Sequence, residues 1–210
     1  MKYTLKVITP PERWPVERAD AMNMVHLDPD NPNNARDQQL LEDMIAGATS
    51  KLEQLTGRAF ITQTLELTLT PVIIPKVTSG ITTYAYEQLP ETIKIWRPPC
   101  QTITGISATA QDLSVHTISP TIYNADIDQE PAMIRLNFNA WWPFYIRGWY
   151  KIQYVAGYGD KLTDVPAPIR HAIRITVAQW WASRENFDYT VPTQAVDLLD
   201  NYAIEANDLI

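Results

Sequence analysis

Apolar residues recur at three- and four-residue steps near the start of the chain, and this pattern predicts a long helix over residues 34–56. Asn34 stands where a side chain can cap the first turn, with Asp37 at the third helical position. Gly57 stands where a left-handed residue can end the helix. The apolar stripe comprises Leu40, Leu41, Met44, Ile45, Ala48, Leu52 and Leu55. A turn cluster at 28–34 precedes this helix, and a shorter helix is predicted within 15–27.

The second long helix is predicted from Asp164 or Ala167 to about Arg184. Pro168 falls in its first turn, where a missing N–H does no harm. The apolar residues at helical spacing are Ile169, Ile173, Val177 and Trp180, with Ile175 and Trp181 off that stripe. We therefore expect the helix to bury two faces, one of them against another subunit. After Pro192 a last apolar stripe is formed by Ala195, Leu198, Leu199, Tyr202 and Ala206.

Between the helices the apolar period changes to two. Leu65, Leu67 and Leu69 alternate with polar residues, which is typical of a half-buried strand. Further short strands are predicted at 82–86, 92–96, 102–109, 114–118, 133–138 and 149–155. The predicted fold is therefore α+β, a helical bundle from the N- and C-terminal helices with a β-rich insertion. We expect one subunit over 1–210, helical at 12–57 and 163–207 and β-rich at 58–160.

Composition narrows the possible functions. The chain has 17 Lys and Arg against 24 Asp and Glu, a net charge of −7, which argues against a protein that mainly grips phosphates. Cys100 is the single cysteine, so neither an intrachain disulfide nor a thiolate metal cluster is possible. The sequence has no apolar run near the roughly 20 residues of a membrane span, and Met1–Lys6 lacks the apolar core of a signal peptide. We expect a protein made in a cytoplasm, without a membrane partner.

The excess of acidic residues is local. After Arg184 the chain has no Lys or Arg, but it has six acids: Glu185, Asp188, Asp197, Asp200, Glu205 and Asp208. Removing these six from 24 leaves 18 acids against 17 bases in residues 1–184. A solvated helix face is the usual cause of such a run, and a docking surface for a basic partner is the alternative.

Motifs of catalysis or ligand binding are incomplete. His26, His116 and His171 lie far apart and fit no zinc-binding spacing. Residues 126–130 begin like a calcium loop, but Pro131 occupies the position that needs Gly, so an acidic turn is the better interpretation. The glycines at 157–159 match neither nucleotide-binding fingerprint. We therefore predict no enzyme, no catalytic residue, no cofactor and no metal.

The segment from Trp141 to Tyr145 is rich in aromatic residues, with Trp149 and Tyr150 close behind. Such residues usually pack on their own sheet when they adjoin a strand. They can also anchor a protein interface or stack on sugars when they are exposed. A β-rich carbohydrate-binding module of a phage tail therefore remains an alternative function, although its fold does not need two long flanking helices.

Several segments resemble the head–tail connector (adaptor, or head completion) family of tailed bacteriophages. The resemblance runs in order over nearly the whole chain, and two of its features are fairly specific together: the Thr-Gly-Arg end of the first long helix and the junction from Ala-Gly-Tyr-Gly to Pro-Ala-Pro-Ile-Arg. The chain departs from the family in a longer stretch at 78–89 and in lacking an Arg after Tyr202. The segments that carry the resemblance are Ala19–Met22, Glu53–Thr64, Arg97–Pro99, Tyr154–Asp160, Val165–Ile173 and Val191–Leu199.

The resemblance implies a structural protein of the virion neck. It implies a homo-oligomeric ring, usually of twelve subunits, that joins the portal protein to the stopper and lets DNA pass without sequence-specific binding. A nearly neutral body would allow DNA to slide. We expect the tail to dock on the portal through Ala195, Leu198, Leu199, Tyr202 and Ala206. Asp197, Glu205 and Asp208 would then face basic groups of the portal or the next subunit.

Overall fold

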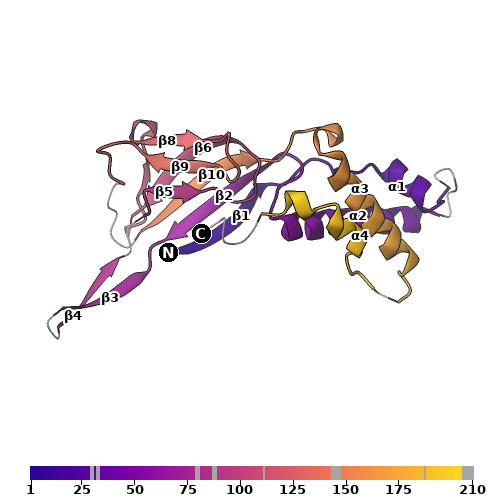
Figure 1. Cartoon of the computed structure of the whole chain (residues 1–210), viewed down its shortest axis with the longest axis horizontal. Helices are drawn as coiled ribbons and strands as arrows, with labels where there is room; N and C mark the ends of the chain where they lie inside the picture. Colours follow the sequence, from indigo (N-terminus) through magenta and orange to yellow (C-terminus); the bar gives the residue numbers. More distant parts are fainter. Residues whose placement is uncertain are drawn as a thin grey trace. The chain divides into compact units, whose positions relative to one another are not determined.

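The computed structural model describes residues 1–28, 31, 34–78, 81–86, 89–110, 112–142, 148–186 and 188–204. Within these ranges the chain divides into two compact units. Met1–Pro10 and Gln63–Ala156 form the β-rich unit, and Pro11–Thr62 with residues 157–204 forms the helical unit (Figure 1).

A five-stranded antiparallel sheet is the main element of the β-rich unit. Its strand order is β1-β2-β10-β6-β7. Leu5, Leu67, Ile152 and Ile106 are partners across four of these strands, so the period-two pattern puts one apolar residue of each strand on the same face. The next row, on the other face, is polar. The strands are β1 (Lys2–Thr9), β2 (Gln63–Thr70), β10 (Trp149–Ala156), β6 (Cys100–Thr109) and β7 (Val115–Thr117).

Two smaller sheets complete this unit. Strands β5 (Thr92–Lys94), β9 (Met133–Leu136) and β8 (Tyr123–Asp126) form a three-stranded antiparallel sheet, in which Ile93 and Ile134 are buried cross-strand partners. A 3-10 helix, Pro120–Ile122, leads into β8. Strands β3 (Ile73–Thr78) and β4 (Ile81–Tyr86) form a two-stranded ribbon.

The helical unit is built around two long helices, α2 (Ala35–Thr56) and α3 (Ala167–Ala182). Leu52 and Val177 are both buried in the hydrophobic core that these helices share, as predicted. Gly57 ends α2 in the left-handed conformation, with a φ of 69°, also as predicted. The remaining elements are α1 (Arg18–Met24), α4 (Thr193–Asp197) and the 3-10 helices Leu162–Asp164 and Asp200–Tyr202.

Gly157 marks the return of the chain from β10 into the helical unit. Its φ is +127°, and a Cβ at this position would lie 2.5 Å from the carbonyl carbon of Ile61. Two neighbouring backbone hydrogen bonds hold the same two segments of the chain together: Tyr158 N–H donates to Phe60 O, and Thr62 N–H donates to Gly159 O. Only glycine allows this close approach of two backbones. Packing of these two backbone segments therefore explains the glycine at 157.

The predicted fold class, a helical bundle with a β-rich insertion, is wrong. More described residues lie in strands than in α-helices, and the chain begins with β1. Of the four α-helices in the described ranges, α1 has only 7 residues and α4 only 5. The last apolar stripe does not continue as a helix, because Leu199 N–H bonds back three residues to Val196 O and Ile204 N–H bonds to Thr56 O.

Several local predictions were also wrong. Strands β1, β3 and β8 were not predicted, although Tyr3, Leu5 and Val7 alternate with polar residues in β1. Asn34 occupies the N-cap position of α2 but makes no capping hydrogen bond; its side chain donates instead to Asp28 O at 3.1 Å. The other predicted strands are present, with ends that shift by up to two residues.

Candidate functional site

The histidines singled out in the sequence lie on separate elements. His26 follows α1, His116 lies in β7 and His171 is exposed on α3. His116 is within hydrogen-bonding distance of Ser114, 2.9 Å from Nε2 to Oγ. Across the described ranges, no group of three or more His, Cys, Asp or Glu side chains is arranged to hold a metal ion. In the same ranges, no helix is both long enough and apolar enough to cross a membrane.

The charged cluster of the β-rich unit connects three strands. Glu66 of β2 is nearly buried, and its two carboxylate oxygens accept hydrogen bonds from Lys151 Nζ at 2.9 Å and Gln153 Nε2 at 3.1 Å. Burial alone would raise the pKa of Glu66, but these hydrogen bonds and the charges of Lys151 and Lys6 hold that pKa below its usual range. Every charge here has an intrachain role, so the cluster stabilises the sheet.

The buried nucleophile candidates are also structural. Burial raises the pKa of the Cys100 thiol to about 11, so it stays protonated at neutral pH. The Tyr154 hydroxyl donates to Trp96 O at 2.7 Å, and burial raises its pKa above the usual range. Neither residue has the depressed pKa of an activated nucleophile.

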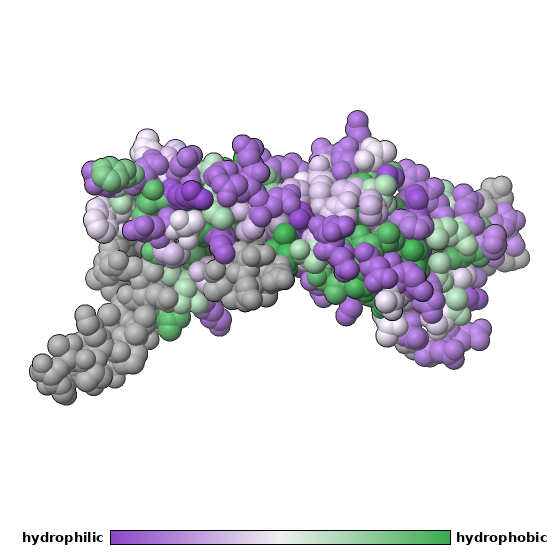
Figure 2. All heavy atoms as spheres, viewed as in Figure 1, coloured by the Kyte–Doolittle hydropathy of each residue, from purple (hydrophilic) through white to green (hydrophobic). Residues whose placement is uncertain are grey.

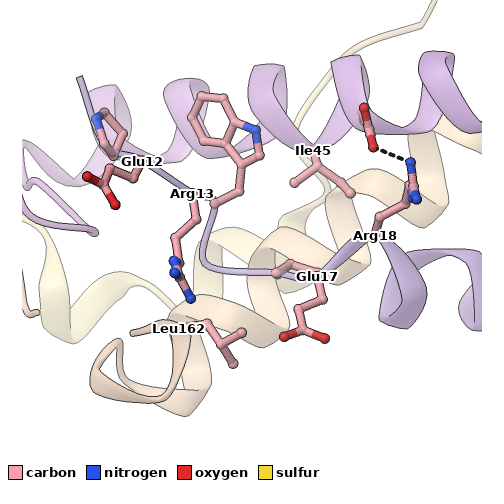
Figure 3. A pocket seen from close by; sticks show the side chains of 10 residues that line it. Glu12, Arg13, Glu17, Arg18, Ile45 and Leu162 are labelled. Carbon is pink, nitrogen blue, oxygen red and sulfur yellow. Dashed lines mark hydrogen bonds and ion pairs between the residues drawn. The ribbon is translucent and has the colours of Figure 1, made fainter. Parts of the chain in front are cut away.

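A groove of about 540 Å³ opens on the helical unit between the segment that precedes α1 and the middle of α2 (Figure 3). Trp14 and Ile45 give it an apolar wall, and 40% of Trp14 is exposed. Arg18 is paired with Glu42 at 2.7 Å. Arg13 and Glu17 extend to the side of the groove that Leu162 occupies. The lining mixes both charges with apolar surface and brings together no acid–base pair for catalysis, so it suits contact with another protein. The groove was not predicted from the sequence, because its lining residues come from separate segments that share no periodic pattern.

The predicted docking stripe of the tail is largely occupied within its own unit. Ala195 and Leu199 are buried in the core, and Leu198 and Tyr202 pack against its outside while staying partly exposed. Arg58, itself buried, donates from Nε to the carbonyl oxygen of Tyr202 at 2.5 Å. Together with the bond from Ile204 N–H to Thr56 O, this contact fixes residues 202–204 at the end of α2.

The remaining tail residues divide in two groups. Asp197 is exposed at the end of α4. Glu205, Ala206 and Asp208 lie outside the described residues. Docking of the tail on a portal therefore stays a prediction. Hydrophobic residues are nevertheless visible on the surface over the region of α2 and α4 (Figure 2). Leu55, near the end of α2, is 47% exposed.

Some aromatic residues of this segment pack on the unit's own sheet, and others are exposed to solvent. Trp142 stacks on Tyr123 and donates from Nε1 to Pro90 O at 2.9 Å. Trp141, in contrast, is 82% exposed, and Phe138 is 96% exposed. Packing on the unit's own sheet therefore explains Trp142 and the buried Tyr150, whereas Trp141 is available for contact. Phe144 and Tyr145 lie outside the described residues.

Comparison with known proteins gives a likeness of structure. No protein-family model matches the sequence, and no curated protein resembles it significantly. A chain in the virion of the native gene transfer agent (GTA) particle has a TM-score of 0.73 and 15% identity, covering 96% of this chain and 95% of that one. A chain in the neck of the empty GTA particle, computed with C6 symmetry, has a TM-score of 0.76 and 16% identity over 96% of both chains.

A third structure gives the same result. A chain in the neck of the native GTA particle, computed with C12 symmetry, has a TM-score of 0.69 and 16% identity, again over 96% of both chains. Because the likeness covers nearly the whole length of each chain, it includes both units of the fold. The chain therefore shares its fold with a chain of the virion and neck of these particles.

Proposed function

We propose that this chain is a structural subunit of the neck of a phage-like particle. The observation that carries the proposal is the fold shared with neck chains of the GTA particle over 96% of both chains. Those necks were computed with C6 and C12 symmetry, which supports a ring of copies. In this proposal the chain is a head–tail adaptor: a twelve-subunit ring beneath the portal joins it to the stopper and lets DNA pass.

The chemistry of the described residues is compatible with a role in assembly. The buried polar groups in the β-rich unit are engaged in intrachain hydrogen bonds, and the groove beside Trp14 is lined for protein contact. We propose that the protein acts without catalysis and that its partners are proteins. Electron microscopy of the full chain mixed with the portal protein of the same particle tests the main proposal. A ring seated on the portal is expected, and a chain that stays monomeric and unbound contradicts it.

We also propose that the end of the tail provides the portal contact. Ala195 and Leu199 are core residues, so their share of the predicted stripe stabilises the subunit itself. The surface available to a portal comprises the partly exposed Leu198 and Tyr202 together with the acids of the tail. Charge there would speed and orient docking more than it tightens it.

Truncation distinguishes the tail residues that stabilise the subunit from those proposed to contact the portal. Deleting residues 192–210 would remove two core residues and destabilise the fold. Deleting 205–210 alone leaves α4 and the contacts of Tyr202 and Ile204 in place. The shorter deletion is expected to keep the melting temperature and to weaken portal binding, most strongly at low salt. Unchanged binding at both low and high salt would remove the tail from the contact.

The exposed Trp141 favours one other function, a carbohydrate-binding module. A single exposed indole provides a stacking platform for one sugar ring. Titration of oligosaccharides followed by tryptophan fluorescence, with Trp141→Ala as the control, distinguishes this function from the neck role. A saturable signal that the variant loses would favour the carbohydrate module.

A further inference from the structure

The β-rich unit presents two exposed aromatic side chains on one short segment. Phe138 is 96% exposed and Trp141 is 82% exposed. Both lie between β9 and β10, in residues 137–142, which we call the aromatic turn. Single exposed apolar residues are normal on a protein surface, but each large aromatic ring that enters a pocket buries about 150–250 Å². Two such rings within four residues therefore offer a partner a concentrated apolar surface.

The aromatic turn is fixed at both ends by hydrogen bonds. The N–H and the side-chain amide of Asn137 both donate, at 2.9 Å, to carbonyl groups of the 3-10 helix that leads into β8. Ala140 N–H donates back to Asn137 O, and Asn139 takes the left-handed conformation that asparagine tolerates, with a φ of 61°. Trp142 donates from Nε1 to Pro90 O. Because the turn is ordered before any partner binds, binding costs it little conformational entropy.

The groove beside Trp14 has the chemistry that an aromatic side chain requires. Trp14, Ile45 and Leu162 give it apolar surface, and its volume of about 540 Å³ lies in the range of sites that enclose drug-sized ligands (Figure 3). Arg13 makes no ion pair or hydrogen bond with a residue that the structure describes. A guanidinium stacks favourably on the face of an indole, and the carboxylate of Glu17 can accept an indole N–H.

Charge decides which exposed apolar residue of the chain suits this groove. Two arginines and three glutamates line it, so a charged occupant of either sign meets a like charge. Leu113 follows Asp112, and Ile127 lies between two aspartates. Leu55 and Val72 have no charged neighbour in sequence, but each is a single aliphatic residue that is only about half exposed. The aromatic turn, with the sequence Asn-Phe-Asn-Ala-Trp-Trp, carries no charge and presents two rings, so it is the best match.

We propose that the aromatic turn of one copy of this chain inserts into the groove beside Trp14 of the next copy. The inference rests on the proposed ring, because a ring of identical subunits requires two different, complementary surfaces on each copy. The exposure of Trp141 means that the turn does not fill the groove of its own chain. In this contact the indole of Trp141 stacks on Arg13, and Phe138 packs on the apolar wall.

The size of this contact determines how it is tested. Two aromatic rings bury about 300–500 Å² of the turn, which is less than the roughly 800 Å² per partner of a standard stable interface. The contact is therefore one anchor within a larger interface, and free subunits need the portal to bring them together. The experiments accordingly use the full chain assembled on the portal protein of the same particle.

Removal of the indole tests the aromatic turn. Trp141→Ala should raise the subunit concentration at which half of the portals carry a ring by at least about tenfold. Circular dichroism and the melting temperature should not change, because the side chain is exposed. Leu113→Ala is the matched control, since Leu113 is 69% exposed elsewhere in the same unit and should assemble like the wild type. Equal assembly of the two variants, counted by electron microscopy, overturns the proposal.

A double-mutant cycle tests whether the turn meets this groove. Arg13→Ala is made alone and together with Trp141→Ala. If the two side chains are in contact, the double variant should assemble about as well as Trp141→Ala alone, because the effects of contacting residues are not additive. Independent effects that multiply would mean that the turn docks on a different protein, such as the portal, and would refute the groove as its site.

Cysteine cross-linking tests the contact directly. Phe138→Cys, which keeps Trp141, is combined with Glu12→Cys at the groove in one full-length variant. In the control variant it is combined with Thr193→Cys, because Thr193 is exposed in the same unit as the groove but does not line it. A short thiol cross-linker is added at a subunit concentration at which both variants form rings. The native Cys100 is buried, and its raised pKa keeps it protonated and slow to react.

The expected result is a ladder of cross-linked subunits from the first variant and monomers from the control. Rings that give no ladder from either variant, or equal ladders from both, refute the contact between turn and groove and leave the neck function intact. Wild-type chains that form no ring at all refute both proposals.

Discussion

The two units of the chain differ in charge and in the way their cores are built. Residues 11–62 and 157–204 contain 9 Lys and Arg against 15 Asp and Glu, a net charge of −6, whereas residues 1–10 and 63–156 contain 8 against 7, a net charge of +1. Four of these 15 acids, Glu185, Asp188, Asp197 and Asp200, follow Arg184, so most of the negative charge of the helical unit lies in its tail. A nearly neutral β-rich unit offers a partner little net charge, whereas an acidic helical unit favours basic protein partners.

The cores of the two units also differ in how their buried polar groups are bonded. Most residues of the helical unit's hydrophobic core are aliphatic, and they come from segments far apart in the chain; Phe60 and Trp180 are the aromatic exceptions. The helical unit buries polar residues too, but the hydroxyls of Thr56 and Thr176 donate to carbonyl groups of their own helices. In the β-rich unit, buried polar groups connect separate segments: Glu66 accepts from Lys151 and Gln153, and the Tyr154 hydroxyl donates to Trp96 O. Loss of volume should therefore dominate the effect of mutations in the helical unit, and loss of hydrogen bonds should add to it in the β-rich unit.

The largest effect is expected in the core of the helical unit. Leu52 is completely buried between α2 and its neighbours, so Leu52→Ala leaves a cavity and should lower the free energy of unfolding by about 2–5 kcal/mol. Leu55→Ala on the same helix is the control, because 47% of Leu55 is exposed and its loss should cost less than about 1 kcal/mol. Urea unfolding measures both. Equal losses would mean that another subunit covers Leu55.

A smaller effect is expected from a buried hydrogen bond of the β-rich unit. Tyr154→Phe keeps the ring but removes the donor to Trp96 O, which leaves a carbonyl group without that partner. The free energy of unfolding should fall by about 1–3 kcal/mol. Tyr189→Phe provides the matched control, since Tyr189 is exposed and its change should stay within about 0.5 kcal/mol. If thermal and urea unfolding show no difference between these variants, polar burial contributes little to this unit.

The same contrast explains what could be predicted from the sequence. A helix is a local pattern, so the apolar steps of α2 and the glycine after it were sufficient to predict its extent. Strand pairing is not local: β1 pairs with β2 across more than fifty intervening residues, and no local pattern near residues 2–9 predicts that partner. The tail was misjudged for a related reason. Its apolar spacing fits a helix, but tertiary hydrogen bonds from Ile204 and Arg58 draw the chain out of helical geometry.

The candidate surfaces were predictable only in part. The exposed Trp141 was singled out by its aromatic neighbours, although its exposure could not be decided without the fold. The groove beside Trp14 has no sequence signature, because its lining comes from an irregular segment, from α2 and from Leu162. Likewise, the burial of Glu66 depends on a register that places Lys151 and Gln153 beside it. Each of these features exists only when distant segments meet.

The smallest effect, and the most specific test of the contrast, concerns Glu66 and pH. Burial alone would raise the pKa of Glu66. Lys151, Gln153 and Lys6 favour the charged form more strongly, so the pKa lies below its usual value of about 4.5. A lowered pKa in the folded state stabilises the fold at every pH above the unfolded value. That stability disappears as the pH falls through the folded pKa and both states become protonated. Glu66→Gln should therefore cost about 1 kcal/mol near neutral pH and almost nothing in strong acid.

Glu91→Gln is the control for this test, because Glu91 is exposed just before β5 and its replacement should change the free energy of unfolding by less than about 0.5 kcal/mol. The measurement is urea unfolding of wild type and both variants from neutral pH downward. A constant difference between wild type and Glu66→Gln at every pH would mean that the second acceptor oxygen of Glu66, and not its charge, is what stabilises the fold. The polar core of the β-rich unit would then be as insensitive to pH as the apolar core around Leu52, and the constant difference would reflect the acceptor that is lost, because an amide has one oxygen for the two donors Lys151 and Gln153.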